Sequence, residues 1–142
     1  MPKIQKGTRR PFVCAVACPS TVRYLPWLRR LVPAAAKASG CRLPAAAIWR
    51  CTVALIEAVN NAMEHAHRRQ AHRLVRIALC CGAAGIRMAV RDQGRPFTLS
   101  GRDVPSPSRR RGRGLYIMRT LMHRVRCRRC RDGNELVLEY RR

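Results

Sequence analysis

The hydrophobic pattern of the chain changes its period near residue 74, and this change limits the folds that it can adopt. Residues 45–68 contain no glycine or proline, and their apolar side chains recur at the three- and four-residue spacing of a helix. From residue 74 to residue 92 the period falls to two, as in two strands joined by a turn at residues 82–85. A long amphipathic helix followed by a hairpin indicates an α+β fold.

The rest of the chain supplies further elements on both sides of this unit. Pro26 and Pro33 each break or kink a helix unless they lie in its first turn, so the first helix is expected to begin near Pro26 and to end at Gly40. Asp132-Gly133 is a favoured turn pair for a final hairpin. The predicted elements outside residues 45–92 are a strand at 12–17, a helix within 20–39, a helix at 115–123, and strands at 125–129 and 135–140. This order predicts an α+β two-layer sandwich.

A length of 142 residues suits one domain. We expect a basic flexible arm at residues 1–11 and a single domain at residues 12–142. Residues 98–111 form a long loop inside that domain, and such loops are usually functional or disordered. No stretch reaches the roughly 18 apolar residues of a membrane helix, and the apolar run near the N-terminus is at the short limit for a signal peptide. The sequence therefore predicts a cytoplasmic protein.

The charge of the chain is strongly positive. It has 30 basic and 7 acidic residues, a net charge of +23, and all basic residues except three lysines are arginine. Such a charge attracts polyanions and acidic surfaces. A GC-rich coding sequence also enriches arginine, and both explanations stay open. Aromatic residues make up only 5% of the chain, which leaves few platforms for stacking on single-stranded nucleic acid, and no zinc-finger or RNP pattern is present.

The eight cysteines include one C-x-x-C pair, Cys127 and Cys130. A zinc site of this type needs two more ligands at suitable spacing, and no second pair of that kind exists in the sequence. We therefore expect buried or incidental thiols, with a metal or redox role as the alternative.

Two polar residues of the long helix could carry chemistry. Glu57 and Asn61 are one helical turn apart, so both can face the same small ligand. A carboxylate can take a proton from a hydroxyl group, and an amide oxygen is a suitable ligand for magnesium. The alternative is a solvated polar face, which any surface helix shows.

Two glycine-containing segments add further candidates. Asp92 follows a strand and can accept a hydrogen bond from an exocyclic amine, and Gly94 would let a planar ring approach the backbone. Gly112 and Gly114 precede a helix, where free backbone N–H groups suit phosphate. The G-x-x-x-x-G-K-[ST] motif is absent, so this is not a P-loop site.

Taken in order, these segments resemble the conserved boxes of the GHKL ATPases. Residues 55–65, LIEAVNNAMEH, resemble the asparagine box, and residues 90–97, VRDQGRPF, the first glycine box. Residues 111–123, RGRGLYIMRTLMH, resemble the second glycine box. In its short length and in the sequence of residues 111–123, the chain resembles the RsbW-like anti-sigma factor serine/threonine kinases. The chain departs from the pattern at Pro96 and Asn134, where glycine and threonine are usual.

This resemblance implies a Bergerat ATP-binding fold, with a mixed, mostly antiparallel sheet and helices on one face. It also implies a Mg-ATP site. In that site Glu57 would be the general base and Asn61 would hold Mg²⁺. Asp92 would bind the adenine amine, and Gly94 would let the ring pack closely. The phosphates would be wrapped by Gly112, Arg113 and Gly114, and the ATP lid would be residues 98–111.

The resemblance further implies partners. Members of the group phosphorylate a STAS-domain anti-anti-sigma protein, sequester a sigma factor and act as homodimers. Two alternatives stay open for this chain. One is a non-catalytic ATP-binding module on the same fold, in which ATP only orders the lid and sets the affinity for a partner. The other is a basic protein that binds nucleic acid directly.

Overall fold

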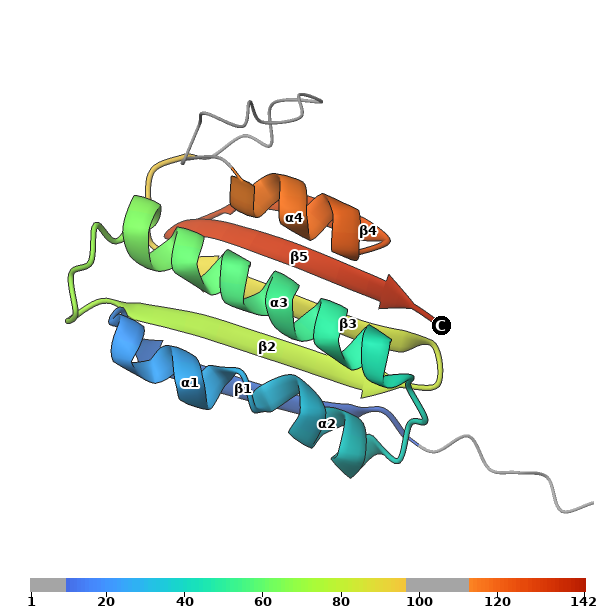
Figure 1. The fold of residues 1–142 in the computed structure, drawn as a ribbon. Helices are drawn as coiled ribbons and strands as arrows, with labels where there is room; N and C mark the ends of the chain where they lie inside the picture. The colour runs from blue at the N-terminus through green and yellow to red at the C-terminus, as the bar shows by residue number, and fades with distance from the viewer. Residues whose placement is uncertain (1–9, 97–112) are drawn as a thin grey trace, which may run out of the picture.

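A five-stranded sheet with helices on one face forms the core of the protein (Figure 1). The computed structural model describes residues 10–96 and 113–142. The strand order is β1-β2-β3-β5-β4, and all four strand pairs are antiparallel. The predicted two-layer α+β sandwich is therefore confirmed. Most of the predicted arm, the whole predicted lid and Gly112 lie outside the described residues.

Each predicted strand is present and extends slightly beyond its expected ends. The strands are β1 (Phe12–Pro19), β2 (Leu74–Gly82), β3 (Gly85–Asp92), β4 (Arg124–Cys130) and β5 (Gly133–Arg141). Alternate side chains point to opposite faces of a strand. In β2 the apolar residues at odd positions are buried against the helices, while Arg76 points to the other face.

The first predicted helix is divided into short segments. They are the 3₁₀ turn η1 (Val22–Tyr24), α1 (Leu25–Leu28) and α2 (Leu31–Ser39). Each proline lies in the first turn of its helix, where the backbone N–H has no helical partner in any case. Gly40 ends α2 in the left-handed conformation, with a φ of 65°, as predicted.

The long predicted helix changes its character before its expected end. It runs regularly as α3 (Ala45–Asn61) and continues as one π-helical turn, η2 (Ala62–Ala66). The His67 N–H donates to the carbonyl oxygen of Ala62 at 2.9 Å, which closes this wider turn. Arg68 and Arg69 then adopt left-handed backbone conformations, with φ of 47° and 58°, and end the helix. The chain therefore turns back toward β2 directly beside the end of β3.

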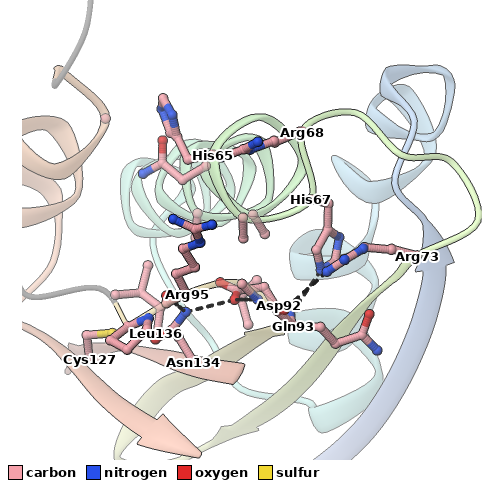
Figure 2. Close-up of a pocket in the computed structure, with 18 of the residues that line it drawn as sticks. His65, His67, Arg68, Arg73, Asp92, Gln93, Arg95, Cys127, Asn134 and Leu136 are labelled. Atoms are coloured by element: carbon pink, nitrogen blue, oxygen red, sulfur yellow. Dashed lines mark hydrogen bonds between the residues drawn. The ribbon is translucent and has the colours of Figure 1, made fainter. Parts of the chain in front are cut away.

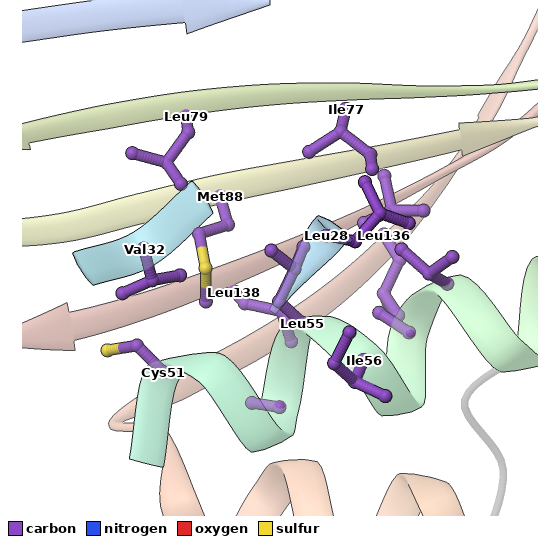
Figure 3. Close-up of a cluster of buried hydrophobic side chains, with 14 of the residues drawn as sticks. Leu28, Val32, Cys51, Leu55, Ile56, Ile77, Leu79, Met88, Leu136 and Leu138 are labelled. Carbon is purple, nitrogen blue, oxygen red and sulfur yellow. The ribbon is translucent and has the colours of Figure 1, made fainter. Parts of the chain in front are cut away.

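The apolar core lies between α3 and the sheet (Figure 3). Leu55 of α3 is fully buried, and Met88 and Leu138 meet it from the central strands. Leu28 and Val32 close the core beside β1 and are also fully buried. These side chains are held in dense packing, so α3 has a rigid base from which to present its polar residues.

The last hairpin differs from the prediction. Its two-residue loop is Arg131–Asp132, and Gly133 is the first residue of β5, paired with Cys130. Gly133 is not in a left-handed conformation. A Cβ at this position would lie 1.7 Å from the carbonyl oxygen of Asp92. Glycine is required here because the neighbouring strand approaches closely, and not because of the turn.

Cys127 and Cys130 lie on one extended strand, β4. A spacing of three residues along a strand is roughly 10 Å, which is beyond the reach of a disulfide. Within the described residues no group of three or more His, Cys, Asp or Glu side chains could hold a metal ion. Among residues 10–96 and 113–142, no helix has the length and apolar character needed to cross a membrane.

Candidate functional site

A pocket of about 660 Å³ lies between η2 and the ends of β3 and β5 (Figure 2). This volume is typical of a pocket for a small molecule or cofactor. Four residues that the sequence predicts as ligand-binding line it: Asn61, Asp92, Gly94 and Gly114. The tertiary structure thus brings the asparagine box and both glycine boxes to one cavity.

Gly114 lies against the two polar residues of α3. A Cβ at Gly114 would lie 3.0 Å from Oε2 of Glu57 and 3.2 Å from both side-chain polar atoms of Asn61. Any larger side chain at this position would displace one of them. Glu57 is not part of the pocket wall, but it contacts the glycine that is. The predicted base and the predicted magnesium ligand therefore meet the start of α4 (Arg113–Leu121).

An arginine of α3 fixes the position of α4. Arg50 donates from Nε to the Leu121 carbonyl oxygen at 3.0 Å and from Nη2 to the Thr120 carbonyl oxygen at 3.2 Å. These are carbonyl groups at the C-terminal end of α4, which have no helical partner and favour a cation. Because α3 and α4 run antiparallel, holding the end of α4 at Arg50 keeps its start at Asn61.

The carboxylate of Asp92 is oriented by two donors. The Gly94 N–H donates to its Oδ1 at 2.8 Å, and Nδ2 of Asn134 donates to the same oxygen at 2.9 Å. Asn134 is 3% exposed, and its Nδ2 also donates to the Arg95 carbonyl oxygen at 2.8 Å. Asn134, at the position where the family usually has threonine, therefore holds both the carboxylate and the following turn.

The turn after β3 packs directly on the π-helical turn. A Cβ at Gly94 would lie 2.6 Å from the Cβ of Ala66, so glycine is needed for this contact as well as for access to the pocket. Two arginines hold the backbone of the turn. Arg129 donates from Nη1 to the Gly94 carbonyl oxygen at 2.8 Å, and Arg73 donates from Nη1 to the Gln93 carbonyl oxygen at 3.1 Å.

A buried histidine connects η2 to the same turn (Figure 2). His67 has no exposed surface, and its Nε2 accepts a hydrogen bond from the Gln93 N–H at 3.0 Å. This bond requires the neutral ring with its proton on Nδ1, and Nδ1 has no partner among the described residues. Burial lowers the pKa of His67, and the nearby Asp92 only partly offsets this effect.

The lowered pKa of His67 predicts a pH-dependent stability. The unfolded chain takes up a proton near pH 6.5, while folded His67 resists protonation to a lower pH. The stabilising contribution of neutral His67 is therefore complete above about pH 6.5 and is lost as the pH falls below that value. We expect the urea midpoint of His67→Gln, whose amide oxygen can still accept from Gln93, to depend less on pH than that of the unmodified protein.

The exposed His65 offers a matched control for this measurement. His65→Gln should keep the pH dependence of the unmodified protein. An unchanged slope of stability against pH in His67→Gln would contradict the assignment.

The charges around the pocket suit an anion that also carries an amine. Arg68, Arg73 and Arg95 line it, and Asp92 is the one carboxylate in its described lining. Beside the pocket, burial raises the pKa of Glu57, and the charge of Glu64 raises it further. A carboxylate with a raised pKa is a stronger base than a solvated one.

Apart from Gly112, which lies outside the described residues, the predicted site residues divide into three groups. Asn61, Asp92, Gly94 and Gly114 line the pocket; Glu57 lies against Gly114; and Arg113 is exposed at the start of α4. Sequence analysis did not assign His67, Arg129 or the role of Asn134. For Asn134, the departure from the usual threonine was a sequence feature that could have indicated its role. His67 and Arg129 showed no such feature, because they act through contacts between distant segments.

Comparison with known proteins agrees with this geometry. The family model described as "Histidine kinase-like ATPase domain" matches residues 18–140. None of the curated protein sequences searched matches the chain. Among solved structures, the RsbU and RsbW domains of Rv1364c from Mycobacterium tuberculosis are similar, with a TM-score of 0.66 and 18% identity over 92% of this chain and 32% of that chain.

A second similar structure is the histidine kinase domain of the blue-light activated histidine kinase from Erythrobacter litoralis EL346. Its TM-score is 0.52, with 20% identity over 84% of this chain and 59% of that chain. The chain therefore spans about a third of the first structure and less than two thirds of the second. The fold that they share is that of ATP-binding, kinase-like domains. The match over residues 18–140 shows that this chain belongs to the family of histidine kinase-like ATPase domains, as its GHKL boxes predicted.

Proposed function

We propose that the chain is an ATP-dependent protein serine/threonine kinase that acts as an anti-sigma factor. Its substrate would be a STAS-domain anti-anti-sigma protein, and its other partner a sigma factor. The contact of Gly114 with both Glu57 and Asn61 is the observation that carries the proposal. It supports a site in which a base and a magnesium ligand lie next to the expected phosphates.

The residues of the pocket fit Mg-ATP in their chemistry. Within the described residues, both hydrogen bonds to Asp92 go to Oδ1, so Oδ2 is left to accept the adenine amine. Because Gly114 has no side chain, the N-terminal end of α4 lies directly against Asn61, and the backbone N–H groups at a helix N-terminus favour an anion such as phosphate. The amide oxygen of Asn61 would hold Mg²⁺. When bound, Mg-ATP supplies the phosphoryl group and neutralises its charge.

Glu57 would then act on the protein substrate. Its carboxylate would accept the proton of the serine or threonine hydroxyl as the hydroxyl oxygen attacks the γ-phosphorus of ATP and ADP leaves with the bridging oxygen. The raised pKa of Glu57 supports this role, because the base must take the proton at the moment of transfer. We include in the proposal a cytoplasmic homodimer, as the RsbW-like resemblance implies.

A transfer assay tests the proposed activity. The protein is incubated with radiolabelled ATP and each STAS-domain protein of the same genome. Label should appear on one of them and disappear when its acceptor serine or threonine is replaced by alanine. Tight ATP binding without transfer to any of them would reject the kinase and leave the ATP-binding module.

Two substitutions in the pocket should weaken nucleotide binding measured by calorimetry. Asp92→Asn replaces a charged acceptor of the adenine amine by a neutral one, and we expect about a 10-fold or greater loss of ATP affinity. Asn61→Ala should cause a loss of similar size only when magnesium is present, because it removes a ligand of the metal.

The adjacent asparagine provides the matched control. Asn60 lies on the same helix but is not part of the pocket wall. Asn60→Ala should bind ATP as the unmodified protein does. Equal ATP affinity of Asp92→Asn, Asn61→Ala and the unmodified protein would reject the site.

A further inference from the structure

The face of the sheet opposite the helices carries an ordered array of arginines. All described helices pack on the other face (Figure 1). On the outer face, β2, β3, β5 and β4 align their residues in three cross-strand rows. From β2 to β4 these rows are Arg76-Arg91-Glu135-Arg128, Ala78-Ala89-Val137-Arg126 and Cys80-Arg87-Glu139-Arg124. They contain six arginines and two glutamates, a net charge of +4.

The two glutamates lie beneath the arginines and leave the cations on the surface. Arg91 and Arg128 both donate from Nε to the carboxylate of Glu135, which is 4% exposed while the two arginine side chains are 54% and 65% exposed. Burial would raise the pKa of Glu135, but these two guanidinium groups outweigh it and hold the pKa below its usual range. The glutamate therefore stays ionised and orients two outward guanidinium groups.

The second glutamate, Glu139, lies between the arginines of β3 and β4 in the row Cys80-Arg87-Glu139-Arg124. Glu139 lies 3.8 Å from Arg87 and 3.5 Å from Arg126, and it is 19% exposed against 56% and 59% for these two arginines. Both carboxylates come from β5, which lies between β3 and β4, and arginines of these two strands flank them on both sides. This arrangement holds the arginines apart and presents them to solvent.

The spacing of the array suits a regular polyanion. Adjacent strands lie about 4.8 Å apart and alternate residues of one strand about 7 Å apart, so the array of four strands and three rows covers roughly 14 by 14 Å. Duplex DNA carries one phosphate charge per about 3.4 Å of helix axis on each strand, so a face of this size can reach several phosphates at once. Guanidinium groups bind phosphate through paired hydrogen bonds.

The composition of the face distinguishes a nucleic acid from a protein partner. Protein interfaces have an apolar, often aromatic centre, whereas protein–DNA interfaces are more polar and much more positive. Ala89 and Val137, at the centre of the array, are 6% and 7% exposed. Among the described residues, the exposed aromatic side chains Trp27, Trp49 and Tyr116 lie on helices, in the other layer, and the exposed Val13 lies on the edge strand β1, outside the array.

We propose that this helix-free sheet face binds the phosphate backbone of duplex nucleic acid without reading its sequence. The array holds no aromatic side chain on which an unpaired base could stack. It therefore favours a duplex over a single strand. The face is on the opposite side of the sheet from the helices that border the nucleotide pocket, so its ligand does not depend on the proposed kinase activity.

Fluorescence anisotropy with a labelled random-sequence DNA duplex of about 20 base pairs tests the proposal. The unmodified full-length chain should bind it, with an affinity that falls steeply as salt increases. The variant Arg76→Gln/Arg87→Gln/Arg126→Gln removes three phosphate contacts and should bind about 10-fold or more weakly at intermediate salt. Its slope of log affinity against log salt should decrease by about 2–3, because each contact contributes about 0.9.

The variant Arg29→Gln/Arg30→Gln/Arg42→Gln is the matched control. It removes the same charge from exposed positions on the helical side of the molecule. Its affinity and salt slope should remain close to those of the unmodified protein. Thermal unfolding of both variants checks that they fold; if the face variant does not, Arg76→Gln alone should still lower the slope by about 1.

Three results would overturn the proposal. The first is equal weakening by the face and control variants, which would mean that only the overall charge matters. The second is tighter binding of the single strand than of the duplex. The third is no binding of the duplex by the unmodified protein; binding of polyglutamate through the same three arginines would then assign the face to an acidic protein.

Discussion

Glu57→Gln is expected to lower the rate of phosphate transfer to the STAS-domain substrate by about 10²–10⁴-fold, the usual contribution of a general base. ATP affinity should change little, because Glu57 is not part of the pocket wall. Glutamine keeps the size of the side chain against Gly114, so a loss of rate reports the missing base and not a disturbed contact. Single-turnover transfer with radiolabelled ATP measures the effect.

Glu64 provides the control for this variant. It lies on η2, pairs with Arg69 at 3.1 Å in an exposed ion pair, and does not line the pocket. Glu64→Gln should transfer phosphate at a rate much closer to the unmodified one, because it leaves the base in place, loses only an exposed ion pair and removes the smaller of the two effects that raise the pKa of Glu57. Full transfer activity in Glu57→Gln would contradict the role of the base, and ATP binding without any transfer by the unmodified protein would favour the non-catalytic module.

The second large effect is expected from Gly133→Ala, which should lower the free energy of unfolding by about 3 kcal/mol or more. The added Cβ would lie 1.7 Å from the carbonyl oxygen and 2.6 Å from the carbonyl carbon of Asp92. Both are backbone atoms, so the clash can be relieved only by separating β5 from the end of β3. Because Asn134 follows Gly133 and holds Asp92, ATP affinity should fall as well.

Urea denaturation measures this loss of stability, and Gly82→Ala is its control. A Cβ at Gly82 would lie 3.1 Å from the Cβ of Pro11, which is a side-chain atom near the end of a strand. We expect that variant to remain within about 1 kcal/mol of the unmodified protein. A Gly133→Ala protein as stable as Gly82→Ala would show that the two strands can separate at this point without cost.

Most of the fold was predicted from patterns among residues that are close in sequence. The change of period at residue 74 and the helical spacing before it placed the long helix and the hairpin, because both patterns depend on neighbours within one turn or one strand. The prediction of the last hairpin turn at Asp132-Gly133 was wrong, although this is a favoured turn pair in sequence. The structure places the loop one residue earlier, at Arg131–Asp132, since the requirement for glycine comes from a different strand.

The candidate site shows the same division between local and distant contacts. The sequence by itself determined the α+β class and the chemical types of its site residues, because helical and strand periods place Glu57 one turn from Asn61 and Asp92 at a strand end. Only the tertiary structure decided that Gly114 meets both residues of α3, that Asn134 orients Asp92, and that His67 supports the adjacent turn. These contacts join residues from 26 to 57 positions apart in the chain, and no local pattern specifies which distant backbone atoms come within hydrogen-bonding distance.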